Sequence, residues 1–298
     1  MRAAVLMLSL LLCAPVQAGP WVPGRWHFSL QLRQAALFAD QRYDAGGARR
    51  PILAVPDQGG APQRASYRQA LTSLSGELGL AQRLSVVLDL LALDAVVQPI
   101  SGRADRTVVG VSDLRLGGKL LLFDDELTAA IEVALTIPTG SAARPLPLGP
   151  GDLRTDFVLH VGKTFRRPDL YLLAEVGFRL RSAAEVANPM VPGTTAQVSY
   201  AHEIRYGAQA GTTWRKGRPG LRWLGAALRI EGSYALASAV EDGLGILNPI
   251  AGSYCKLGPE VTWSPLLGLL FGVGGGYFVA GREMPAMGEA WLSVTYLR

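Results

Sequence analysis

Cysteine and histidine are nearly absent from this chain of 298 residues, which has 2 cysteines and 3 histidines. The cysteines are Cys13 and Cys255, and the first lies in a predicted leader that is removed. The mature chain would then keep one cysteine, which excludes an intramolecular disulfide and a cysteine metal cluster. The histidines, His27, His160 and His202, are isolated from one another, and no metal-spacing motif surrounds them. We therefore expect no metal and no cofactor.

Charge is also sparse, because only 18% of the residues are Asp, Glu, Lys or Arg. The formal net charge is +5, and loss of Arg2 with the leader would leave +4. This excess is small and scattered along the chain, so it does not predict a nucleic-acid partner.

The first 18 residues have the features of a cleavable secretory signal. Arg2 supplies a positive start, residues 3–13 are apolar, and small residues lead to a cleavage position after Ala18. The apolar stretch is too short to anchor the chain across a bilayer. We predict a mature domain over 19–298. A lipoprotein signal at Cys13 is a weaker alternative, because a leucine precedes that cysteine where a small residue is needed.

A long apolar helix is missing from the mature chain, although 49% of all residues are hydrophobic. The nearest candidate begins at Leu266, but glycines interrupt it repeatedly, which favours a strand. High apolarity without membrane helices, behind a secretory signal, is typical of a transmembrane β-barrel.

Apolar and polar residues instead alternate with a period of two. Trp26, Phe28, Leu30 and Leu32 alternate with polar residues, and the same pattern returns around Phe157. This period predicts strands with one apolar and one polar face. We expect about twelve of them, at 25–38, 66–80, 83–95, 111–123, 127–138, 151–165, 170–182, 199–214, 221–235, 253–263, 266–280 and 289–298.

The connections between these segments are alternately short and long. The short ones include Ala81-Gln82 and Ser264-Pro265, whereas the long ones are rich in Gly, Pro, Ala and Ser. Short periplasmic turns and long external loops characterise outer-membrane barrels. The fold class is therefore all-β, a transmembrane antiparallel up-and-down barrel in the outer membrane, with both termini in the periplasm.

Aromatic residues gather at one end of alternate predicted strands. Amphipathic rings prefer the membrane interface, so this clustering agrees with the same orientation. The residues concerned are Trp26, Phe123, Phe165, Trp214, Trp223, Trp263 and Tyr296.

The charged residues within the predicted strands are expected to face the interior, because Arg or Lys facing lipid at the midplane costs about 2–4 kcal/mol each. Asp94 is the exception, since the alternation places it on the outer face. The inward-facing set has equal numbers of acidic and basic residues, which favours a cross-strand ion-pair network. Such a network either fills the interior structurally or lines a narrow polar channel. The predicted lumen-lining residues are Asp113, Arg115, Lys119, Glu132, Arg154, Asp156, Glu175, Arg179, Glu203, Arg205, Arg229, Glu231, Lys256 and Glu260.

A row of glycines occupies one face of the predicted strand 266–280, at Gly268, Gly272, Gly274 and Gly276. A bare inner wall leaves room for a loop, a plug or a ligand. Equally, it allows the sharp bend of a barrel corner.

Several short motifs resemble the outer-membrane barrels grouped as the MetA-pathway of phenol degradation family. They are "SDLRLGGK" from Ser112, "VALTIPTG" from Val133, "GPGDLRTDFVLHV" from Gly149, and a preceding hairpin at 77–85. The resemblance covers roughly 67–182. It implies a barrel of this size that passes small hydrophobic compounds, with no catalytic residues to assign. The final Leu297-Arg298 depart from the aromatic end that is usual in such barrels.

These observations favour a porin-like or transporter barrel for small compounds, hydrophobic ones included, with outer-membrane lipid around it. The alternative is a structural barrel that anchors a multi-protein envelope machine for motility, secretion or polysaccharide export. The long loop at 39–65 serves as a lid in the first case and as a docking surface in the second. An outer-membrane lipase is the least favoured, because no serine-centred motif accompanies the histidines. We therefore expect a non-enzyme.

Overall fold

The architecture is taken from a computed structural model. In its described part, no helix is long and apolar enough to cross a membrane. The predicted signal peptide at 1–18 lies outside the described residues. These residues are 19–54, 61, 63–64, 66–98, 106–140, 150–166, 169–187, 195–214, 223–236, 252–266 and 268–298.

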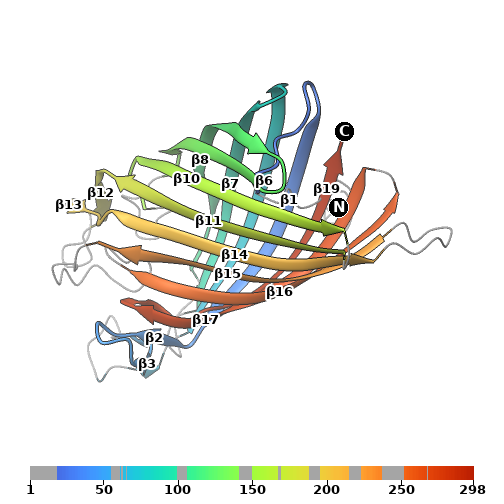
Figure 1. Cartoon of the computed structure of the whole chain (residues 1–298). Helices are drawn as coiled ribbons and strands as arrows, with labels where there is room; N and C mark the ends of the chain where they lie inside the picture. Colours follow the sequence, from blue (N-terminus) through green and yellow to red (C-terminus); the bar gives the residue numbers. More distant parts are fainter. Residues whose placement is uncertain are drawn as a thin grey trace, which may run out of the picture.

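Twelve antiparallel strands form a closed barrel, in agreement with the predicted fold class. Each strand pairs with the next one of the barrel along the chain, and β1 closes the wall by pairing with both β6 and β19 (Figure 1). The strands are β1 (Phe28–Ala39), β6 (Ser66–Ala81), β7 (Leu84–Gln98), β8 (Arg106–Asp124), β9 (Thr128–Pro138), β10 (Arg154–Arg166), β11 (Asp169–Arg181), β14 (Glu203–Trp214), β15 (Trp223–Ala235), β16 (Ser253–Leu266), β17 (Leu269–Arg282) and β19 (Gly288–Leu297).

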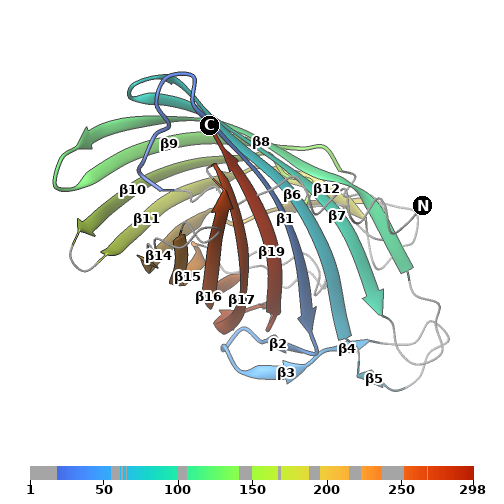
Figure 2. The same ribbon diagram turned by 90° about the vertical axis from the view of Figure 1, so that its right-hand side faces the viewer.

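Short strands form small sheets at one end of the barrel, opposite the end where β1 begins and β19 finishes (Figures 1 and 2). One is three-stranded, in the order β18-β2-β3, and the others are the pairs β12-β13 and β4-β5. Their bounds are β2 (Gln41–Tyr43), β3 (Arg49–Pro51), β4 (Leu53–Ala54), β5 (Gln63–Arg64), β12 (Ala183–Ala187), β13 (Thr195–Ser199) and β18 (Met284–Pro285).

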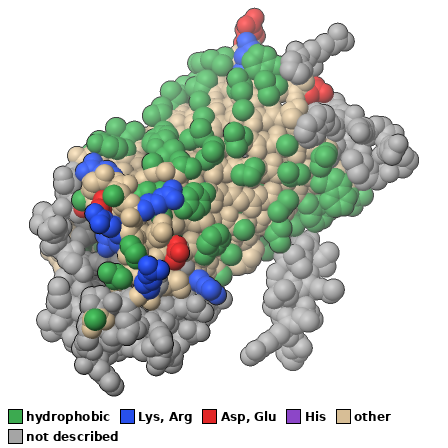
Figure 3. All heavy atoms as spheres, turned by 90° about the horizontal axis from the view of Figure 1, so that it is seen from below, with side chains coloured by type: hydrophobic (Ala, Val, Ile, Leu, Met, Phe, Trp, Pro, Cys, Tyr) green, Lys and Arg blue, Asp and Glu red, His purple; other side chains and the backbone are tan. Residues whose placement is uncertain are grey.

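The alternation of the sequence sets the two faces of the wall. On β9, Ile131, Val133 and Leu135 are exposed on the outside, whereas the residues between them are buried. Large exposed apolar side chains cover the outer wall in the same way (Figure 3). An apolar outer band around a polar interior is the pattern of a barrel that sits in lipid.

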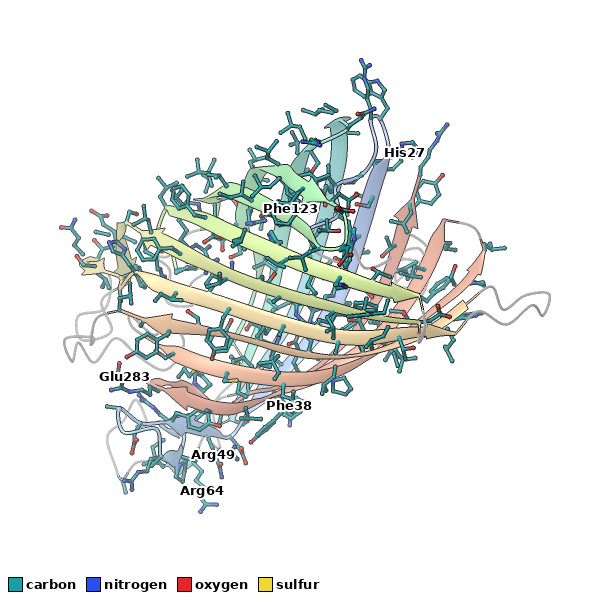
Figure 4. All side chains as sticks on the ribbon, viewed as in Figure 1. His27, Phe38, Arg49, Arg64, Phe123 and Glu283 are labelled. Atoms are coloured by element: carbon teal, nitrogen blue, oxygen red, sulfur yellow. The ribbon has the colours of Figure 1, made fainter. Side chains whose placement is uncertain are left out.

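Exposed aromatic rings stand near the chain-end rim, as predicted. Phe123, Trp263 and Tyr296 are exposed, Tyr296 packs against Phe28, and Figure 4 labels Phe123 at this end. The side chains of Trp214 and Trp223 lie outside the described residues, as does that of Asp94.

Several predicted strand limits were wrong. The strand expected from residue 111 begins five residues earlier, at Arg106 of β8, and three other differences have a visible cause. Trp26 does not open the first strand, because its φ of 62° places it in a turn before Phe28. The strand expected from residue 199 begins at Glu203, because 195–199 pair with β12 instead. Ser264 and Pro265, which were predicted to form a turn, are part of β16. The chain reverses direction later, at Gly268 with φ 80°.

At two positions of the predicted glycine row, Gly274 and Gly276 of β17, side chains from neighbouring strands occupy the space beside the backbone. A Cβ at Gly274 would collide with the Trp291 ring from β19, and one at Gly276 would meet the stem of Lys256 at 3.0 Å. The Trp291 ring also lies under the Arg33 guanidinium, 4.8 Å from its centroid. The space beside these two glycines is therefore taken by neighbouring side chains, a use that was not among those expected from the sequence.

Gly274→Val should therefore destabilise the barrel by about 1–3 kcal/mol, the usual cost of overpacking. Equilibrium urea unfolding, followed by tryptophan fluorescence, measures this change. Gly118→Val is the matched control, because its Cβ would meet nothing closer than the Ser85 carbonyl oxygen at 4.0 Å. Equal stability losses in the two variants would contradict this account of the row.

The segment that precedes β1 lies inside the chain-end rim of the barrel. Pro20 is fully buried, and a Cβ on Gly162 of β10 would meet it at 2.7 Å. The carbonyl oxygens of Pro23 and Gly24 closely approach Gly79 of β6. Residues 19–24 therefore run along the inner side of the wall from β10 to β6 and narrow this opening.

Candidate functional site

A belt of ion pairs follows the inner face of the wall through ten of the strands. Six of the nine contacts named below join adjacent strands, which is the geometry of cross-strand pairing. Arg229–Glu231 lies within β15, and Glu175–Arg229 and Lys256–Glu289 each reach past one strand. In order around the barrel, the contacts join Asp89–Arg115 (2.8 Å), Arg115–Glu132, Glu132–His160 (3.3 Å), His160–Glu175 (3.4 Å), Glu175–Arg229 (3.8 Å), Arg229–Glu231 (2.8 Å), Glu231–Lys256 (2.6 Å), Lys256–Glu289 (2.5 Å) and Glu289–Arg33.

Asp156 on β10 is the most highly shared acid of this belt. Its carboxylate accepts from Arg179 at 2.7 Å and Arg205 at 3.4 Å, and Arg115 lies 3.6 Å away. The side chain is only 1% exposed, so one buried negative charge holds three guanidinium groups from β8, β11 and β14. Arginine forks suit such shared carboxylates, because each presents several donors in a fixed plane.

A more deeply buried pair lies on β6 and β8. Lys119 donates to Glu77 at 2.9 Å, and the Ser85 hydroxyl donates to the same carboxylate at 2.5 Å. The two charged side chains are 1% and 4% exposed. Because both charges have left water, each depends on the other for its compensation.

A third group of charges lies near the rim that carries the small sheets. Arg181 binds Asp152 at 2.6 Å and Glu203 at 2.8 Å, while Arg154 pairs with Asp113. Asp113 reaches this position through a β-bulge, since the β7–β8 register skips Ser112 and both residues are buried. A bulge of this kind redirects side chains at a barrel rim.

His160 joins two strands of the belt rather than forming a catalytic dyad. Its ring nitrogens lie 3.3 Å from Glu132 and 3.4 Å from Glu175, and the side chain is buried. A serine nucleophile requires a histidine within reach of its hydroxyl. His202 lies on the outside, 6.2 Å from the Phe178 ring, so neither histidine provides that arrangement in the described part of the chain.

A cavity of about 280 Å³ lies within the barrel, inside the belt. Its wall is drawn from β1, β6 to β11, β14 and β15, so it reaches most of the way around the interior. Arg205 and Arg229 are the inner charges most open to it, at 37% and 41% exposed. Arg229 also lines a second cavity of about 40 Å³ beside Glu260 and Trp291. The open part of the interior therefore presents mainly guanidinium groups.

The predicted set of charged residues is brought together in these groups. Arg115, Glu132, Asp156, Glu175, Arg179, Arg205, Arg229, Glu231 and Lys256 belong to the belt, Lys119 to the buried pair, Asp113, Arg154 and Glu203 to the rim group, and Glu260 to the smaller cavity.

Sequence reasoning missed several members of the network. Arg33 and Glu289 complete the belt on β1 and β19, and Glu77, Asp152 and Arg181 complete the other groups. All occupy positions where the alternation would place a side chain inside, so the pattern contained the signal. In the described part of the chain, no group of three or more His, Cys, Asp and Glu residues is placed to hold a metal ion.

Comparison with solved structures shows what this fold resembles. An outer-membrane channel from Pseudomonas putida F1 is similar over 96% of this chain and 100% of its own, with a TM-score of 0.65 and 15% sequence identity. The NanC porin is similar over 90% of this chain and 98% of its own, with a TM-score of 0.50 and 6% identity. The chain has the fold of an outer-membrane β-barrel. No protein-family model and no curated protein matches the sequence.

Proposed function

We propose that this protein is a narrow porin-like channel of the outer membrane that passes small solutes. The observation that carries the proposal is the 280 Å³ cavity inside a closed barrel, with charged groups on nearly every side. A rigid ring of paired charges keeps the wall open while exposing polar groups to a solute. The structural likeness to an outer-membrane channel supports the same reading.

The charged belt is the proposed lining of this channel, and small polar or ionic solutes are the cargo that it suits best. The family resemblance implies a hydrophobic cargo. Such a cargo would have to pass exposed guanidinium groups, and a charged lining of this kind does not favour the transfer of an apolar molecule out of water. We also infer membership of the MetA-pathway family, on the motifs of 67–182 and on the full-length likeness to an outer-membrane channel. We also propose the orientation in which both termini lie in the periplasm, on the side of the short turns.

Single-channel recording of the refolded mature protein in planar bilayers tests the proposal. We expect steady openings whose conductance rises with salt. Liposome swelling with small sugars and with organic acids then compares neutral and ionic solutes. A barrel that is folded, as judged by heat-modifiable migration on gels, but that never conducts would overturn the proposal and favour an anchoring role.

Arg205→Gln combined with Arg229→Gln should move the ion preference of the channel toward cations. Removing the two most exposed guanidinium groups lowers the positive potential where ions pass, and we expect about a twofold change in the anion-to-cation permeability ratio. The reversal potential in a KCl gradient measures it. Arg68→Gln, which removes an exposed arginine from the outer face of β6, is the control and should leave the potential unchanged.

A further inference from the structure

The three-stranded sheet β18-β2-β3 is fastened to the outer end of β17. Tyr43 is buried with Phe278 and Met284, and its hydroxyl donates to the Phe278 carbonyl oxygen at 2.6 Å. In the pairing of β2 with β3, Tyr43 lies opposite Arg49 and Arg42 lies opposite Arg50. The sheet therefore holds several arginines in fixed positions at the rim.

Arg49 lies directly over the membrane-facing wall. Its guanidinium is 5.1 Å from the centroid of the Tyr277 ring and 5.4 Å from that of Tyr43, and its Nε donates to the Tyr43 hydroxyl at 3.1 Å. Tyr277 pairs with Leu257 on the outer face of the barrel and is 40% exposed. Arg49 thus stands where the apolar band of the wall ends.

Other arginines surround this position. Arg68 faces outward on β6, beside Phe38 in the β1–β6 register, and Arg64 pairs with Leu53 just after β3. Figure 4 labels Arg49, Arg64 and Phe38 at this end, and Figure 3 shows Lys and Arg side chains gathered beside the apolar wall. The outer basic patch consists of the exposed residues Arg49, Arg50, Arg64, Arg68 and Arg282.

The acidic groups of the same segments do not balance the patch. Asp44 is engaged by Arg50 at 3.1 Å and by two backbone amides, and Asp40 and Glu283 are the other described acids. Arginines that border a lipid-facing wall are stable at headgroup level, where anionic groups compensate them, but not deeper in the bilayer. The opposite rim, where the chain ends lie, is the periplasmic one in the proposed orientation.

We propose that the outer basic patch binds the phosphate groups of phosphorylated glycolipids in the outer leaflet. Planar guanidinium forks recognise phosphate by paired N–H donors, and the Tyr43 and Tyr277 rings hold the Arg49 fork in place. The neighbouring Phe38 and Tyr277 side chains supply apolar surface for the acyl chains of the same lipid. The site thus joins a phosphate end and a hydrocarbon end, as a lipid requires. It rests on the orientation of the barrel and is independent of whether the barrel conducts.

Native mass spectrometry of the detergent-solubilised mature protein tests this site, with bis-phosphorylated lipid A as the probe. We expect lipid A adducts on the unaltered barrel and at least roughly tenfold weaker binding after Arg49→Gln with Arg68→Gln, since each surface arginine contributes appreciably to anionic lipid binding. Arg49→Lys with Arg68→Lys keeps the charge without the fork and should retain part of the affinity.

Arg25→Gln with Arg83→Gln is the matched control, because both arginines are exposed at the opposite rim and Arg25 likewise stacks on an aromatic ring, that of Trp26. Heat-modifiable gel migration verifies that every variant is folded. Equal lipid A binding by the Arg49/Arg68 and control variants would overturn the proposal. So would equal binding of dephosphorylated lipid A. Complete displacement by millimolar inorganic phosphate would identify a simple anion site instead and would overturn the lipid assignment.

Discussion

Deletion of residues 19–24 is expected to raise the single-channel conductance several-fold. This segment lies inside the opening at the chain ends, with Pro20 fully buried against β10 and the carbonyl groups of Pro23 and Gly24 against β6. Its removal widens the opening without altering the barrel strands, which begin at Phe28. Because conductance depends on the narrowest part of the path, the gain is large only if this segment forms that part.

Two further variants make this result interpretable. Pro20→Ala with Trp21→Ala keeps the segment at full length and should give a smaller increase, since it removes side chains but not the backbone. Arg205→Gln with Arg229→Gln should leave the size of the opening unchanged and alter the ion preference instead. If the deleted protein folds and conducts like the unaltered one, the segment does not restrict the path, and the belt around the 280 Å³ cavity becomes the constriction.

Lys119→Met is expected to cost about 3–5 kcal/mol of the free energy of unfolding, because it leaves a buried charge without its partner. The Glu77 side chain is only 4% exposed, and it would retain only the Ser85 hydroxyl as a hydrogen-bond donor. Urea unfolding of the refolded protein in detergent measures the change. Lys119→Met with Glu77→Gln removes both charges and should recover most of the lost stability.

Lys163→Met provides the matched control for this experiment. Its partner is Glu126 at 3.7 Å, and the two side chains are 38% and 89% exposed. An exposed pair of this kind contributes about 0–1 kcal/mol, because water compensates both charges. Similar losses for Lys119→Met and Lys163→Met would mean that the interior of the barrel is as well hydrated as its surface, and that the Glu77–Lys119 pair is not isolated from water.

In the charged network, the alternation of the sequence predicts which face of the wall a residue takes, whereas the three-dimensional contacts decide its ion-pair partner. The period of two assigned Arg115, Glu132 and Asp156 to the inner face, because lipid rejects charge and a strand has only two faces. The partners did not follow from that argument. Asp156 holds Arg179 on the adjacent strand and Arg205 on the strand beyond it, an arrangement that depends on the tilt and closure of the wall.

The ends of the strands show the same division. The strand Glu203–Trp214 was expected to begin at residue 199. Residues 195–199 pair with β12 instead, so two possible partners with strand-like sequences competed for this segment. Likewise, the glycines of β17 predicted either a bare inner wall with room for a loop, a plug or a ligand, or a sharp bend, whereas Trp291 from β19 packs against Gly274. A local pattern has no information about a neighbour that arrives from elsewhere in the chain.

The sequence by itself determined the class of fold and the approximate strands, and it predicted the face of many charged strand residues, because these depend on a residue and its immediate neighbours. Only the tertiary structure decided which charges pair, where the interior stays open and how residues 19–24 narrow one end. It also placed Arg49 over Tyr277, two residues that are distant in the chain. Such contacts depend on the register between strands and on barrel closure, which bring together side chains that no local spacing relates.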